Sequence, residues 1–116
     1  MTDRWAIRLA GAFDQAALDA LRADLDLEPR GRLGDDYDEL FGRGDTEIAG
    51  RPVTLSLWRD ETMTDVTWRI AVESDSTLSD QEANAIAARV DAAARRAGPL
   101  SVASVFHRPP PEGDTE

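Results

Sequence analysis

The order in which strand-like and helix-like segments follow one another is the strongest constraint that this sequence places on its fold. Alternating apolar and polar residues predict strands around Trp5–Leu9, Val53–Leu57 and Val66–Val72, because successive side chains of a strand point to opposite faces. The apolar, β-branched segment Leu100–His107 predicts a fourth strand. One helix is expected after the first strand and another before the last, which gives the order βαββαβ.

The second helix has the clearer boundaries. Ser79 and Glu82 form an S-x-x-E capping box, in which hydroxyl and carboxylate each satisfy a backbone donor of the first turn. Arg95 and Arg96 place positive charge near the C-terminal end, where the helix dipole favours it, and Gly98 follows as a stop. Apolar residues recur at spacings of three and four and predict a stripe of mostly small side chains: Ala83, Ile86, Ala87, Val90, Ala94 and Ala97.

The first helix is predicted by similar signals. Asp14 is placed as its N-cap, and Leu18, Leu21 and Leu25 fall on one face. Pro29 ends this helix at the latest, because proline cannot continue a helical hydrogen-bond pattern.

These elements predict an α+β fold, a ferredoxin-like βαββαβ sandwich with both helices on one face of a four-stranded antiparallel sheet. Residues 1–108 are expected to form one domain, and residues 109–116 a flexible, acidic and proline-rich tail. An additional short strand around Thr46–Ala49 is compatible with the pattern. In the last strand regular alternation would place Val102 and Phe106 on one face and Val105 on the other. A β-bulge would reconcile these facings.

Composition excludes several classes of partner. The net charge of −10 repels phosphate backbones and anionic lipids, so we expect no binding to nucleic acid or membranes. The same charge is compatible with a basic protein partner. The chain has no cysteine, no apolar run of about 18 residues and no export leader, which favours a cytoplasmic location.

Few residues are suited to catalysis, and we predict no cofactor, no metal and no catalytic residue. A single histidine without cysteine cannot build a common zinc site, and a Walker loop needs a lysine, which the chain lacks. His107, at the end of the last strand, is the one candidate general base, although a lone histidine there is more often an ordinary surface side chain.

The segment between the first helix and the second strand, residues 30–51, is acidic and contains aromatic residues. One or two helical turns are predicted before Gly42. Three interpretations of this segment remain open: a calcium site, a docking element for a basic partner, or aromatic rings that cap the core. The calcium site is disfavoured because Leu40 and Phe41 occupy positions that an EF-hand gives to a ligand and a glycine. The docking residues would be Asp35, Asp36, Tyr37, Asp38, Glu39 and Phe41.

The sheet face without helices is the second candidate site. Alternation assigns Trp5, Ile7, Leu9, Leu55, Trp68 and Ile70 to the core, and Ala6, Arg8, Ala10, Thr54, Ser56, Trp58, Thr67, Arg69 and Ala71 to the open face. In the predicted topology the first and third strands are neighbours, which would bring Arg8 close to Arg69. Paired arginines beside Trp58 would suit an anionic ligand or the sheet of a second subunit.

Two functions follow from these features. The favoured one is a small, non-enzymatic protein-binding module of inhibitor, immunity or accessory type, which acts on a basic protein partner. The alternative is a homodimeric ligand-binding or enzymatic α+β domain that takes a small anionic ligand on the open face, through Arg8, Trp58 and Arg69.

Overall fold

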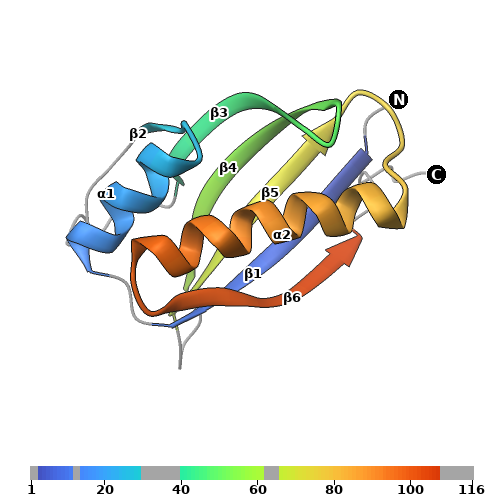
Figure 1. Cartoon of the computed structure of the whole chain (residues 1–116). Coiled ribbons are helices and arrows are strands. Elements are labelled where there is room, and N and C mark those ends of the chain that lie inside the picture. The colour runs from blue at the N-terminus through green and yellow to red at the C-terminus, as the bar shows by residue number, and fades with distance from the viewer. Residues whose placement is uncertain (1–2, 12–13, 30–39, 62–65, 108–116) are drawn as a thin grey trace.

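The computed structural model describes residues 3–11, 14–29, 40–61 and 66–107, with the side chains of residues 60, 61 and 66 excepted. They form a six-stranded antiparallel sheet in the order β2-β3-β4-β5-β1-β6, and two helices that lie together on one face of it (Figure 1). The elements are β1 Asp3–Gly11, α1 Gln15–Asp24, β2 Glu28–Pro29, β3 Leu40–Ile48, β4 Arg51–Glu61, β5 Val66–Ser74, α2 Asp80–Ala97 and β6 Leu100–His107.

The predicted four-stranded ferredoxin-like layout is wrong. The four predicted strands are present as β4, β5, β1 and β6, and the expected pairing of the first and third strands is confirmed by β1 with β5. Two further strands, β2 and β3, extend the sheet beyond β4. β3 lies in the segment 30–51, which was expected to be a loop with a short helix, and it includes residues 46–48 of the short strand that the pattern allowed. Leu40 and Phe41 lie in β3, so the helical prediction is wrong for these residues, and Gly42 continues the strand where a helix stop was predicted.

Close packing explains why β3 contains two glycines. A Cβ atom at Gly44 would lie 2.6 Å from the carbonyl oxygen of Asp26, and one at Gly42 would lie 3.2 Å from Cβ of Leu27. The chain that leaves α1 therefore rests directly on β3. At Gly44 only glycine leaves room for that backbone, whereas a side chain at Gly42 would require Leu27 to shift slightly. Ala49 and Gly50 then make the tight turn into β4, both with positive φ.

The predicted helix caps are confirmed. The carboxylate of Asp14 accepts a hydrogen bond from the Ala17 N–H at 2.8 Å, and both halves of the capping box formed by Ser79 and Glu82 are present. Neither helix is long and apolar enough to cross a membrane, within the residues described.

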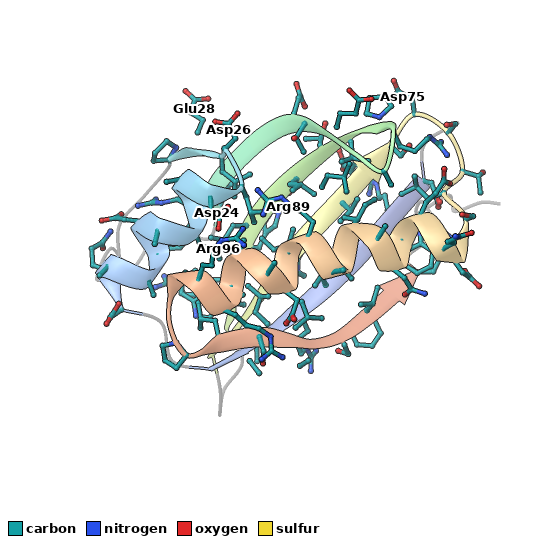
Figure 2. The ribbon with its side chains drawn as sticks, viewed as in Figure 1. Asp24, Asp26, Glu28, Asp75, Arg89 and Arg96 are labelled. Carbon is teal, nitrogen blue, oxygen red and sulfur yellow. The ribbon has the colours of Figure 1, made fainter. Side chains whose placement is uncertain are left out.

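Asp24, at the end of α1, joins the two helices. Its carboxylate accepts hydrogen bonds from Arg96 at 2.8 and 3.0 Å and from Arg89 at 3.1 Å, both on α2 (Figure 2). The hydrogen bond with Arg96, together with that from Arg89, holds the pKa of Asp24 below its ordinary value. This shared carboxylate fixes the end of α1 against α2.

The hydrophobic core lies between the helices and the sheet. The residues predicted for it are buried, except Trp5, which is half-buried at its margin. The predicted bulge in the last strand is also confirmed: Arg8 pairs with Ser104 but Leu9 pairs with Val102, which leaves Ala103 without a partner. Val102 and Val105 can therefore both pack against the core.

Candidate functional site

The face of the sheet opposite the helices has a central row of small side chains. Ser56 on β4, Ala71 on β5 and Ala6 on β1 are direct cross-strand partners, so they form a line across three strands. The same line continues to Arg43 on β3 at one end and to Phe106 on β6 at the other. The side chains of this row are therefore short in the middle and long at both ends.

Two flanking rows with larger side chains enclose this low centre. In one, the guanidinium carbon of Arg69 lies 5.4 Å from the centre of the Trp58 ring. In the other, Nε of Arg4 lies 3.6 Å from Oε2 of Glu73. The result is a cavity of about 360 Å³, called the trough below, which is lined by Arg4, Trp5, Ala6, Arg43, Ser56, Trp58, Arg69, Ala71, Val72 and Glu73.

Hydrogen bonding orients the floor of the trough. The indole N–H of Trp58 donates to Oγ of Ser56 at 2.9 Å, two residues earlier on the same face of β4. Since that oxygen already accepts a hydrogen bond, the hydroxyl proton of Ser56 is left to donate to a group in the trough. The floor therefore offers a donor at its β4 end.

The charge of the trough differs from that of the chain as a whole. Its lining carries three arginines, Arg4, Arg43 and Arg69, and one acid, Glu73, whereas the chain has a net charge of −10. Arg43 is exposed and makes no ion pair with any residue that the structure describes. The trough is thus a local positive region on an acidic protein.

The structure brings together part of the predicted open-face site. Trp58 and Arg69 both line the trough. Arg8 is the cross-strand partner of Arg69, as expected, but it lies outside the lining and stacks on Phe106, with 5.8 Å between its guanidinium carbon and the ring centre.

The predicted docking element is only partly described. Phe41 is fully buried, with its ring 5.1 Å from that of Trp68 in edge-on contact and 5.1 Å from the guanidinium carbon of Arg59. This position agrees with the interpretation in which the aromatic ring caps the core, and it makes Phe41 unsuitable as an exposed anchor. The other docking residues, Asp35, Asp36, Tyr37, Asp38 and Glu39, lie outside the described residues.

Sequence reasoning did not select Arg43 or Arg4 for the site. The missed signal for Arg43 is the charged alternation Arg43, Asp45, Glu47, which marks one face of a strand. Because Gly42 and Gly44 on either side of Arg43 favoured a loop, the face that Arg43 occupies was not predicted.

His107 pairs with Trp5 across β6 and β1 and is not among the residues that line the trough. Its Nε2 is 2.6 Å from Oδ1 of the buried Asp3, and its ring stacks on Trp5 with 4.7 Å between centres. Asp3 also accepts the Leu78 N–H at 2.9 Å, just before α2. This arrangement ties the ends of β1 and β6 to the start of α2, so we assign it a structural role.

The described residues contain no group of three or more acidic or histidine side chains that could hold a metal ion. Comparisons of the chain with protein-family models, curated proteins and solved structures found no match. The function is therefore argued from the geometry of the trough.

Proposed function

We propose that this protein binds a small anionic ligand in the trough on the open face of its sheet. The observation that supports the proposal is the gathering of Arg4, Arg43 and Arg69 around a floor of small residues, on a chain that is otherwise strongly acidic. Guanidinium groups bind carboxylates and phosphates through charge-assisted, often bidentate hydrogen bonds. The volume of about 360 Å³ is at the lower end for ligand sites.

Each arginine has a different part in this proposal. Arg43 is exposed and has no ion pair in the described part of the chain, so no partner among those residues competes with the anion for it. Arg69 is positioned by its stacking on Trp58. Arg4 already faces Glu73, and the ligand would have to share it. The strongest contacts are therefore expected from Arg43, Arg69 and the hydroxyl of Ser56.

Binding is better supported than catalysis. The lining residues in the described part of the chain include no histidine, and the one acid among them, Glu73, faces Arg4. General acid–base chemistry needs a titratable group within hydrogen-bond reach of the reacting atoms. The geometry thus favours a protein that holds an anion over an enzyme that transforms one.

Isothermal titration calorimetry with inorganic phosphate at low salt tests the proposal. Arg43→Ser and Arg69→Ser should each weaken phosphate binding about tenfold, the effect of losing roughly 1.4 kcal/mol. Arg95→Ser is the matched control, because it removes the same charge from an exposed site on α2. Absence of phosphate binding by the natural chain, or an equal loss in the control, would overturn the proposal.

A basic protein partner is a second candidate, supported by acidic residues next to the trough. Asp26, Glu28 and Asp45 line a hollow at the β2–β3 edge, together with Gly44 and with Arg43, which also lines the trough. Asp26 and Glu28 point outward from this edge (Figure 2). The acidic segment from Asp35 to Glu39 directly precedes β3 in the chain. A positively charged partner would be attracted to such an edge.

Neutralising the acidic segment tests this second candidate. Changing Asp35, Asp36 and Asp38 to Asn and Glu39 to Gln should weaken capture of a basic protein such as a histone, and more so at low salt. Unchanged capture would contradict it. Light scattering tests the homodimer separately, and a strict monomer at high concentration would exclude it.

A further inference from the structure

The central row of the open face changes character from one end to the other. Within the trough it begins with the cation of Arg43 and the hydroxyl of Ser56 and continues over the methyl group of Ala71 and the almost completely buried methyl group of Ala6. Beyond the lining of the trough it ends at the ring of Phe106, the cross-strand partner of Ala6. We infer that the ligand is an elongated anion, with its charged headgroup at Arg43 and Ser56 and an apolar, aryl-like body that reaches Phe106. This inference rests on the proposed function.

The exposure of Phe106 supports the apolar end. It is 45% exposed and is the only exposed large hydrophobic side chain among those described. Arg8 stacks on one side of its ring, 5.8 Å from the ring centre. An exposed aromatic ring one strand beyond the trough is a suitable surface for an apolar group of a ligand.

The length of the row sets the size of the ligand. Neighbouring strands are about 4.8 Å apart, so the backbone positions of Ser56 and Phe106, three strands apart, are separated by about 14 Å. Inorganic phosphate would occupy only the Arg43 end. A ligand that uses both ends must carry an extended body.

The width of the row limits the shape of that body. The flanking rows lie two residues away along each strand, which is about 7 Å from the central row. On one side stand Trp58 and Arg69, and on the other Arg4 and Glu73. A narrow, flat body such as an aromatic ring system fits between them better than a branched one.

The test compares three probes: inorganic phosphate, 1-naphthyl phosphate and 1-naphthol. The natural chain should bind 1-naphthyl phosphate at least about tenfold more tightly than phosphate, and 1-naphthol weakly. Phe106→Ser should remove most of the gain and change the phosphate Kd by less than about twofold. Ala103→Ser, also exposed on β6 but outside the row, is the control and should leave all three affinities unchanged.

The outcomes separate this inference from the proposed function. Equal affinity for phosphate and 1-naphthyl phosphate, or an equal effect of Phe106→Ser on both, would overturn the inference and leave anion binding intact. Tight binding of 1-naphthol would show that the headgroup is not recognised, and would also overturn it. Failure of the natural chain to bind either anion would overturn the proposed function, and the inference with it.

Discussion

The two faces of this sheet are built by the same strands, yet they differ in almost every physical respect. On β4, Leu55 and Leu57 are fully buried beneath the helices, whereas Ser56 and Trp58 belong to the trough. The covered face is filled by large aliphatic side chains. The open face has its smallest side chains in the centre and its charges around them.

The difference shows that one alternating pattern can specify a core and a binding surface independently. A residue and its neighbour along the strand point to opposite faces, so a change at one leaves the other face almost untouched. Stability should therefore depend on the residues of each strand that face the helices, and ligand binding on the residues that face the trough. Three predictions follow from this separation.

The largest effect is expected for neighbouring substitutions on β4. Leu55→Ala should lower the free energy of unfolding by about 3 kcal/mol, because it leaves a cavity in the core. Ser56→Ala should lower it by about 1 kcal/mol or less, since only the hydrogen bond from Trp58 is lost. Urea denaturation measures both values, and similar losses for the two variants would contradict the separation.

An intermediate effect is expected when one alanine on the covered side and one on the open face of the sheet are each replaced by leucine. Ala93→Leu on α2 should cost about 2 kcal/mol in unfolding free energy, because Ala93 is fully buried. Ala71→Leu should change stability by no more than about 0.5 kcal/mol. Its larger side chain fills the floor of the trough, and calorimetry should show about tenfold weaker phosphate binding. Unimpaired binding would place the ligand elsewhere.

The smallest effect concerns acid stability at the edge of the covered face. Burial of Asp3 opposes its ionisation, but hydrogen bonds from Leu78, His107 and Trp5 outweigh it and hold the pKa of Asp3 below its ordinary value. This carboxylate therefore stabilises the fold above about pH 4, and the contribution is lost as pH falls through the lowered pKa.

Asp3→Asn should cost about 1 kcal/mol at neutral pH, and the difference from the natural chain should shrink in acid. Thermal unfolding between neutral and acidic pH measures this change. Glu73→Gln, at the half-exposed pair on the open face, is the comparison and should alter stability by only a few tenths of a kcal/mol. A stability difference for Asp3→Asn that stays constant with pH would contradict the assignment.

Local signals in the sequence were sufficient for much of this structure. The capping residues Asp14, Ser79 and Glu82 predicted both helix starts, and period-two alternation predicted that Trp58 and Arg69 share the open face. These features depend on residues close together in the chain. The predicted neighbours β1 and β5 followed from the topology of the four strands that were recognised.

The features that were not predicted depend on contacts between segments that are distant in sequence. Gly44 accommodates the backbone at Asp26 and Leu27, Gly42 accommodates the side chain of Leu27, and nothing in the local pattern of β3 reveals that approach. The fold prediction failed at this point, and Arg43 was missed with it. The irregular pairing between Leu40 and Gly42 also let Phe41 turn into the core, where it cannot serve as a docking anchor.

The unpaired Ala103 has a consequence for how this protein tolerates changes in length. Val102 and Phe106 are four residues apart and would share a face in a regular strand, yet Val102 packs against the core and Phe106 is exposed. Deleting Ala103 would therefore give a regular strand in which every later residue of β6 keeps its facing, and β6 should tolerate this loss. Pairing Ala103 with β1 in place of the bulge would instead reverse the facing of every later residue. One unpaired residue thus decides on which face of the sheet Phe106 lies.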